Sequence, residues 1–402
     1  MTGSVATKRT KEIEENVYEM AKERFRSLFA RFDKVFVSFS GGKDSTIVLN
    51  VGLEVAREMG RLPLDVLFVD EEVCTPETHD YVNRVRQWPD VRMKWACLPI
   101  LHRNACSRED LWWACWDKEA EDRWVRPMPD YPEVVTVDMV PGFKHGMKLP
   151  DVGALLYGPE NGTVADCAGI RAQESPRRMQ SVLNKGKDNF IADPVKAFYY
   201  YCKPIYDWQT EDVWTAIHTL KWDYNQTYEV LRLIGAGANK QRVCPPWGEE
   251  PLRGLHEYSE GWPELWDKMT ARVKGCNTAK LYAKTDIYGW APKEPPKGMT
   301  WQEWAISLLK LYPRAEQAEI STNIKRAIKL HRKKTKRPIP ETTADIHTGL
   351  SWKAIAQMIA RGDLKGRKLG ALYMQAVAQQ KKADLTIKDV QKMDAADTSI
   401  IV

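Results

Sequence analysis

The chain has 402 residues, with 60 Lys and Arg against 54 Asp and Glu, and its formal net charge is +6. This length allows two or three domains, each with its own hydrophobic core. Hydrophobic residues at 43% and charged residues at 28% are close to the averages of folded proteins, which excludes a largely disordered chain.

The cysteines and the apolar residues exclude further classes of protein. The eight cysteines never come closer than nine positions apart, which excludes the paired spacing of a zinc ribbon and the density of a small disulfide-linked scaffold. No stretch approaches the roughly 18 apolar residues of a membrane span, and charged side chains near the N-terminus replace the apolar core of a signal peptide. We therefore expect a cytoplasmic protein with reduced thiols and no membrane partner.

Helix and strand patterns alternate from the N-terminus. The spacing of apolar residues predicts a helix at 13–29, a strand at 35–39, a helix at 46–59 and a strand at 64–69. Two strands joined by a helix favour a parallel sheet with right-handed crossovers. Because ligands bind beyond the carboxyl ends of such strands, the segment 40–45 and Asp70 would lie at the ligand site.

The alternation continues beyond this unit but is interrupted once. Further elements are expected at 76–88 (helix), 93–98 (strand), 165–170 (strand), 174–183 (helix), 198–206 (strand) and 210–220 (helix). A Trp- and Pro-rich stretch at about 99–163 is expected to be a long insertion. The predicted organisation is an α/β domain at 1–235, a Pro-, Gly- and Trp-rich connecting region at 236–299 and a helical C-terminal module at 300–402.

The segment between the first strand and the helix after it is typical of a phosphate-binding loop. It consists of Ser40, Gly41, Gly42, Lys43, Asp44 and Ser45. Two glycines allow backbone N–H groups to turn toward an anion, and the positive end of the helix, the Lys43 ammonium and the two hydroxyls add to that site. It is not a Walker loop, because the four-residue spacer is missing and Asp44 replaces the magnesium-binding Ser or Thr. The alternative is a Gly-Gly turn whose polar neighbours are incidental.

Four ordered blocks resemble the PP-loop ATP-pyrophosphatase superfamily, and within it the phosphoadenylyl-sulfate (PAPS) reductase-like branch. The blocks are residues 40–45, Asp70 with 75–78, 169–175 with Arg177 and Arg178, and 203–214. The resemblance implies a Rossmann-like fold of the adenine nucleotide α-hydrolase type. In that fold the loop would hold the pyrophosphate of ATP or the phosphosulfate of a sulfonucleotide.

The resemblance and the side-chain chemistry together nominate the site residues. The nucleotide would contact Ser38, Ser40, Gly41, Gly42, Lys43, Asp44, Ser45, Asp70, Gly169, Arg171, Arg177 and Arg178. Lys43 and Arg171 would neutralise phosphate oxygens, and Lys43, Asp70 and Arg171 are the candidate catalytic residues. Asp44 and Asp70 are candidate ligands of magnesium, which prefers one or two carboxylates together with phosphate oxygens. The alternative for Asp44 and Arg178 is a helix N-terminal acid and a solvated arginine.

A reductase in this branch needs a thiolate nucleophile, which it carries in a Cys-Gly-Leu-His element near the C-terminus. The chain lacks this element, and its last cysteine is Cys276. The adjacent cysteines that hold an iron–sulfur cluster in the adenylyl-sulfate reductases are absent too. Cys244, in a loop stiffened by two prolines and a glycine, is the candidate for a redox or cluster role. Buried free cysteines are the commoner case, so an iron–sulfur cluster is the less favoured alternative.

Six of the 16 tryptophans lie between Trp88 and Trp124. They are expected to form a satellite core under the insertion, with stacking on a base or an adenine ring as the alternative. Residues 117–129 and 351–363 resemble a largely uncharacterised bacterial and prophage family of PAPS reductase-like proteins. Some members are linked to a ParB-like partner and to gene activation, which makes a ParB-like protein a candidate partner.

One segment of the C-terminal module is strongly basic. Its eight cations, with no acidic residue among them, are Lys325, Arg326, Lys329, Arg332, Lys333, Lys334, Lys336 and Arg337. The formal charge of the whole chain is smaller than the charge of this segment, so the excess is local. A solvated helix face usually mixes signs, and an unbalanced run favours contact with a polyanion such as DNA or RNA. The alternative is a plain basic surface.

These observations favour an enzyme that binds ATP with magnesium, cleaves its α–β bond and adenylates an acceptor, in a nucleic-acid modification for example. The second interpretation is a DNA-associated regulator that binds ATP or PAPS without turnover. The third is a sulfonucleotide reductase that uses Cys244.

Overall fold

The computed structural model describes residues 16–107, 109–174, 178–179, 182, 189–194, 196–237, 241–247, 254–282 and 294–380. The chain consists of two compact units, residues 1–281 and 282–402. No helix among the described residues is long and apolar enough to span a membrane.

The first unit is built on a six-stranded sheet with the strand order β6-β3-β2-β1-β7-β8, in which every neighbouring pair is parallel. The strands are β1 (Lys34–Ser38), β2 (Leu64–Val69), β3 (Val91–Cys97), β6 (Val134–Thr136), β7 (Val164–Ala168) and β8 (Tyr199–Cys202). A separate antiparallel hairpin consists of β4 (Leu101–Arg103) and β5 (Trp112–Ala114). The predicted α/β fold with a parallel, Rossmann-like sheet is confirmed.

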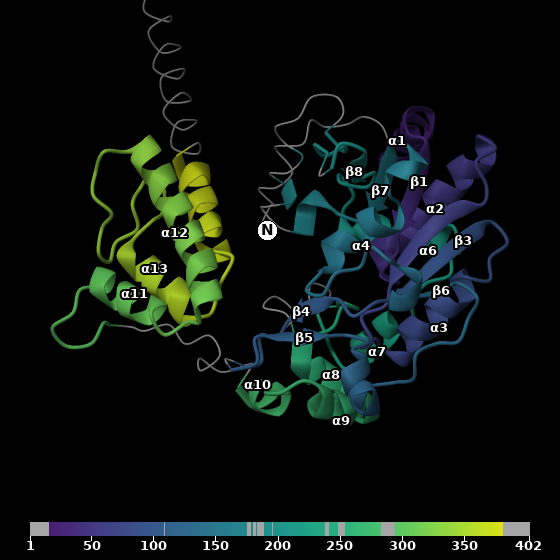
Figure 1. Cartoon of the computed structure of the whole chain (residues 1–402). Coiled ribbons are helices and arrows are strands. Elements are labelled where there is room, and N and C mark those ends of the chain that lie inside the picture. The colour runs from purple at the N-terminus through teal and green to yellow at the C-terminus, as the bar shows by residue number, and fades with distance from the viewer. Residues whose placement is uncertain are drawn as a thin grey trace, which may run out of the picture. The chain divides into compact units, whose positions relative to one another are not determined.

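Helices flank this sheet (Figure 1). They are α1 (Val17–Arg31), α2 (Lys43–Glu58), α3 (Pro76–Val85), α4 (Leu149–Leu156), α6 (Thr210–Thr219), α7 (Thr227–Leu233), α8 (Leu255–Gly261), α9 (Pro263–Arg272) and α10 (Cys276–Tyr282). α2 packs against α1 and α6, and α4 packs against β2. The helices of the expected connecting region therefore lie mostly in the first unit, since α8 and α9 precede residue 281.

The helix after β1 begins three residues earlier than the sequence pattern predicts. Gly42 has an extended backbone, with φ −84° and ψ 159°, and is the N-cap of α2. Lys43, Asp44 and Ser45 therefore form the first helical turn instead of belonging to a loop before it. The N–H groups of this turn, for which the helix has no internal acceptor, lie in the segment that follows β1.

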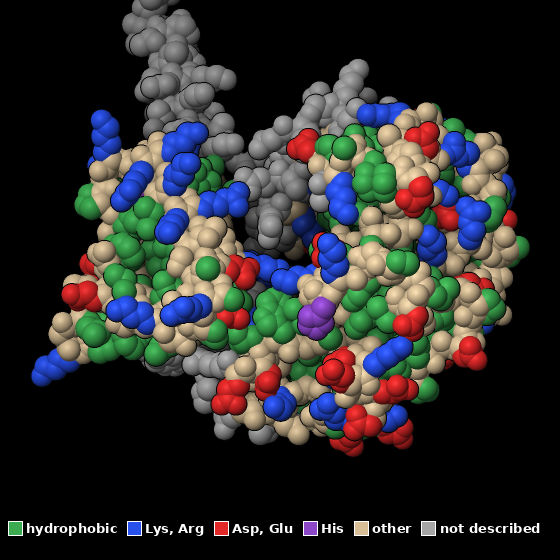
Figure 2. Space-filling view, viewed as in Figure 1, with side chains coloured by type: hydrophobic (Ala, Val, Ile, Leu, Met, Phe, Trp, Pro, Cys, Tyr) green, Lys and Arg blue, Asp and Glu red, His purple; other side chains and the backbone are tan. Residues whose placement is uncertain are grey.

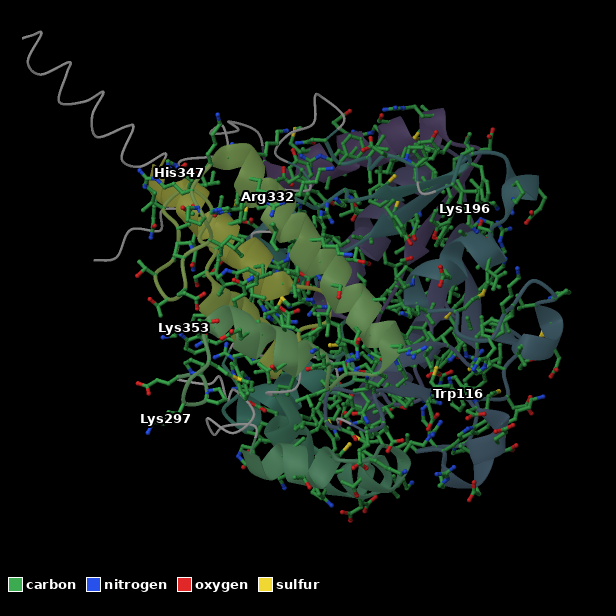
Figure 3. All side chains as sticks on the ribbon, turned by 60° about the vertical axis from the view of Figure 1, so that its left-hand side comes forward. Trp116, Lys196, Lys297, Arg332, His347 and Lys353 are labelled. Atoms are coloured by element: carbon green, nitrogen blue, oxygen red, sulfur yellow. The ribbon has the colours of Figure 1, made fainter. Side chains whose placement is uncertain are left out.

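The Trp-rich stretch at 99–163 supplies parts of the sheet domain itself. Its strand β6 pairs with β3 at the sheet edge, and its helix α4 lies against the sheet. The side chains of Trp113 and Trp116 in this stretch are buried, and the position of Trp116 is marked in Figure 3. These tryptophans thus belong to a core, as the commoner alternative predicts, and do not offer free faces for stacking.

The second unit is helical. Its elements are α11 (Trp301–Leu309), α12 (Arg314–Lys334), α13 (Trp352–Ala360) and a helical stretch at 367–380. α11 and α13 pack closely, and their core includes Trp301, Ile320, Ile355 and Met358. The basic segment of the sequence analysis forms the last turns of α12 and the residues that follow it.

Candidate functional site

The candidate phosphate loop lies next to β1, where the order in which strands are added to the sheet reverses. The chain leaves β1 for β2 on one side, whereas β7 pairs with β1 on the other side. Open α/β sheets bind their ligands in the crevice beyond the strand ends at such a switch point. Residues 40–45 follow β1 and residues 169–171 follow β7, so both segments border this crevice.

Two positions in these segments require glycine, one because of its backbone conformation and the other because two segments approach closely. Gly41 has φ +70°, a conformation that side chains with a Cβ rarely adopt. A Cβ on Gly169 would lie 2.7 Å from the carbonyl carbon of Asp44 and from the amide nitrogen of Ser45. The segment after β7 can therefore lie against the first turn of α2 only because residue 169 has no side chain.

Side-chain oxygens hold the backbone of the loop in place. The Ser40 N–H donates to Ser45 Oγ at 3.2 Å, and the Gly42 N–H donates to Ser40 Oγ at 3.3 Å. The Lys43 N–H donates to the Tyr228 hydroxyl oxygen, at 3.0 Å. These three N–H groups therefore already have protein oxygens as partners, which hold the loop in its turned shape.

The charged residues of the site are joined through Asp44. Arg171 Nε lies 2.6 Å from Asp44 Oδ1, and Lys43 Nζ lies 3.3 Å from Asp44 Oδ2. Arg171 is 3% exposed, and its Nη1 also donates to Gln173 Oε1 at 2.8 Å. One carboxylate therefore keeps two cations side by side, although they are 128 positions apart in the sequence.

Burial weakens the proton affinity of the lysine. The pKa of Lys43 is lowered from its usual value chiefly by desolvation, and the nearby positive charges of Arg171 and Arg242 add to that effect. The Asp44 carboxylate acts in the opposite direction. A polyphosphate entering this crevice would meet cations that are already desolvated, so their attraction for it would exceed that of surface lysines.

Asp70 has a different environment from the one expected of a magnesium ligand. It is fully buried, its carboxylate pairs with Arg126, whose Nη2 lies 2.6 Å from Oδ1, and the Trp95 indole N–H donates to Oδ2 at 2.7 Å. Both carboxylate oxygens of Asp44 are likewise taken by cations. The arrangement therefore does not fit a magnesium ion held by Asp44 and Asp70, and we derive no step through one.

Three other nominated residues lie apart from the loop or outside the described residues. The Ser38 hydroxyl donates to Asp166, whose pKa burial raises to about 6. Arg178 contacts the carboxylate of Glu174. Arg177 and most of the helix expected at 174–183 lie outside the described residues.

Residues from further along the chain cover the loop, and sequence analysis did not nominate them. The Tyr228 hydroxyl contacts the Lys43 amide, and the Lys43 ammonium lies 5.4 Å from the centre of the Tyr228 ring. Val243 Cγ2 would be 3.3 Å from a Cβ on Gly42. The only local signal was the stiff Pro and Gly composition around Cys244, because an apolar helix such as α7 does not reveal which loop it covers.

The cysteines do not gather into a metal centre in the described part of the chain. None of the eight, all of which the structure describes, forms a disulfide, and Cys244 alone among them is exposed. No group of three or more His, Cys, Asp or Glu side chains in the described ranges has the geometry of a metal site. An iron–sulfur cluster therefore finds no ligand set there.

Comparisons with known proteins match both parts of the chain. Residues 34–231 match the phosphoadenosine phosphosulfate reductase domain, and residues 235–354 match a domain of unknown function, DUF3440. The uncharacterized protein YbdN of Escherichia coli (strain K12) is 32% identical over 371 residues, which cover 88% of this chain and 90% of that protein.

Two solved structures are similar at low identity. A PAPS reductase from Candida auris, in a phosphate complex, has 15% identity and a TM-score of 0.32, covering 57% of this chain and 93% of that one. An FMN adenylyltransferase from Candida glabrata has 13% identity and a TM-score of 0.31, covering 54% of this chain and 62% of that one. Given the identity over nearly its whole length, the chain, whose PAPS reductase domain precedes DUF3440, belongs to the family of YbdN.

Proposed function

We propose that this chain is a nucleotide-binding enzyme that cleaves the α–β bond of ATP and transfers adenylate to an acceptor. The observation that carries the proposal is the pairing of Lys43 and Arg171 through Asp44 beside the loop after β1. The match of residues 34–231 to a domain named for a nucleotide substrate supports it. We keep nucleic acid as the candidate acceptor class and the cytoplasm as the location.

The residues of the crevice suit that reaction. An acceptor oxygen would attack the α-phosphorus, the bond from that phosphorus to the bridging oxygen would break, and pyrophosphate would leave. The Lys43 ammonium and the Arg171 guanidinium would stabilise the charge that develops on the leaving group. The backbone N–H groups at the start of α2 would hold the phosphates in place.

Replacing Lys43 by Ala is expected to lower the rate of pyrophosphate release from ATP by about 100- to 1,000-fold, the usual cost of removing one charge-stabilising group. Pyrophosphate is measured with a coupled assay on the whole protein, with and without candidate acceptors. The matched control is Lys118→Ala, which removes an exposed lysine paired with Asp138. If the wild type binds ATP tightly and releases no pyrophosphate with any acceptor, the protein is instead a DNA-associated regulator that binds the nucleotide without turnover.

A second candidate function rests on Cys244. It is the exposed cysteine of the chain, and its neighbour Val243 lies against Gly42 of the loop. In a sulfonucleotide reductase, its thiolate would attack the sulfur of PAPS and release adenosine 3′,5′-bisphosphate. An external dithiol would then release sulfite from the resulting S-sulfonate and become a disulfide.

If this second function holds, Cys244→Ser is expected to abolish sulfite release from PAPS in the presence of a dithiol. Mass mapping after incubation with PAPS alone should then find the S-sulfonate on Cys244, with the seven buried cysteines as internal controls. Unchanged sulfite release by Cys244→Ser, or no adduct at this residue, excludes the reductase reading.

A further inference from the structure

The basic segment at the end of α12 presents an unbalanced positive surface. Its eight cations are all exposed: Lys325, Arg326, Lys329, Arg332, Lys333, Lys334, Lys336 and Arg337. None of them lies within ion-pairing distance of a carboxylate in the part of the chain that the structure describes. Lys and Arg side chains gather at this end of the second unit in Figure 2, and Figure 3 marks Arg332 on α12. We call this surface the basic face.

Packing of α12 onto its own unit determines which way these side chains point. Ile320, Ile324 and Ala327 pack on the core of the second unit. His331 continues that line and is 1% exposed, with its Nδ1 2.8 Å from Thr348 Oγ1 and its Nε2 3.0 Å from the Arg337 carbonyl oxygen. Because this side of the helix is buried, Lys325, Arg326, Lys329, Arg332 and Lys333 lie on the opposite side.

Ordinary helix-surface chemistry does not account for the basic face. On α1 of the same chain, two partly exposed cations have acidic partners: Lys22 pairs with Glu58, and Arg26 pairs with Glu23 and Glu58. Cations in a last helical turn are favoured by the helix dipole, which accounts for those near Lys334. It does not account for Lys329 and Lys325, which lie five and nine residues before Lys334, and this local excess of positive charge favours a polyanionic partner.

The spacing of the cations suits the phosphates of a duplex. Lys325, Lys329 and Lys333 are separated by four residues each, which places them about 6 Å apart along the helix. The stretch from residue 325 to 334 is about 14 Å long. B-DNA carries one negative charge per about 1.7 Å of its axis, so this length faces roughly eight phosphates.

The composition of the basic face excludes other polyanions. A membrane-surface helix needs a free apolar side, and the apolar side of α12 is packed on the core of its unit. Single strands are bound with stacking aromatic side chains, and residues 325–337 contain none. Protein interfaces also concentrate aromatic residues. A helix can approach the wide major groove of B-DNA, where its cations would reach the flanking phosphates, whereas the deep, narrow major groove of an RNA duplex does not admit one.

We propose that the basic face of α12 binds the phosphate backbone of double-stranded DNA without regard to sequence. Contacts made only by long cationic side chains neutralise phosphates and read no base edges. This proposal does not rest on the nucleotide chemistry of the first unit, and each can fail without the other.

Lys329→Ala/Arg332→Ala/Lys333→Ala tests the proposal in the full chain. Binding of labelled duplex DNA of two unrelated sequences is measured by fluorescence anisotropy over a range of salt concentrations. The wild type should bind both sequences alike. The triple variant should bind more weakly, and the slope of log affinity against log salt should become shallower by about 2.7, which is about 0.9 for each of three lost phosphate contacts.

The matched control is Lys297→Ala/Lys310→Ala/Lys365→Ala, which removes three exposed lysines of the same unit outside the basic face. It should leave the salt slope close to that of the wild type, and thermal unfolding should show that both triple variants are folded. An unchanged slope in the first variant overturns the proposal. So does tighter binding of the wild type to duplex RNA, single-stranded DNA or anionic vesicles than to duplex DNA.

Discussion

Replacing Arg272 by Met is expected to lower the free energy of unfolding of the first unit by about 3–5 kcal/mol, the usual cost of leaving a buried charge without its partner. Glu72 is fully buried directly after β2, and its carboxylate oxygens lie 2.9 Å from Arg272 Nε and 3.1 Å from Arg272 Nη2. The N–H groups of Trp116 and Val125 also donate to this carboxylate. The Glu72 carboxylate thus connects α9, through Arg272, and the Trp-rich stretch, through Trp116 and Val125, to the segment after β2.

Urea unfolding followed by tryptophan fluorescence measures this change. The control is Arg84→Met, because the pair of Arg84 with Asp223 is exposed and is expected to contribute less than about 1 kcal/mol. Arg272→Met combined with Glu72→Gln should recover part of the loss, since it removes the unpaired charge. If the Arg272 and Arg84 variants are equally stable, Glu72 is reached by water and the buried pair does not hold α9.

Gly169→Ala is expected to weaken nucleotide binding about 100-fold while the protein remains folded. The new methyl group would meet the backbone of Asp44 and Ser45 at 2.7 Å, so the first turn of α2 must shift. A misplacement of about 1 Å can lower a reaction rate by a factor of about 100, and we expect a loss of similar size in nucleotide affinity. The shift would also move Asp44 away from the Arg171 guanidinium with which it pairs.

Calorimetric titration with ATP and with PAPS measures the affinity, and far-ultraviolet circular dichroism checks the fold. The control is Gly237→Ala, since a Cβ there meets no heavy atom within 4 Å. Wild-type affinity in the Gly169 variant would show that the nucleotide does not bind at the loop after β1. That result would overturn the proposed site while leaving the DNA-binding proposal untouched.

The strands and the loop were predictable because their signals are local. The strands of the βαβ unit are runs of β-branched and aromatic residues, and β2 was predicted with its observed bounds. The loop was recognisable from two glycines, a lysine and the two flanking strands. Arg171 was nominated because the blocks that resemble the family come in a fixed order, and its guanidinium lies beside Asp44 of the loop.

The role of Asp70 was not predictable from its position after β2. Any carboxylate at that strand end is near the crevice, but the partner of this one is Arg126, which lies 56 positions later in a stretch without periodicity. A buried carboxylate pairs with the cation that the fold brings to it, because leaving it unpaired costs several kcal/mol. Tyr228 was not predicted for a similar reason. Its hydroxyl oxygen accepts from the Lys43 N–H, but it belongs to α7, which has no phosphate-binding motif.

By itself, the amino-acid sequence determined most strands of the parallel sheet, the position of the Gly-Gly turn after β1 and where the positive charge of the chain collects. These properties depend on steric preferences and charges within a few neighbouring residues. Only the tertiary structure decided that Asp44 forms ion pairs with both Lys43 and Arg171, and that Arg126 forms an ion pair with Asp70. It also decided which side of α12 packs on the core and which side leaves cations exposed. Such pairings are set by distance and desolvation between segments far apart in the chain, and no local pattern encodes either quantity.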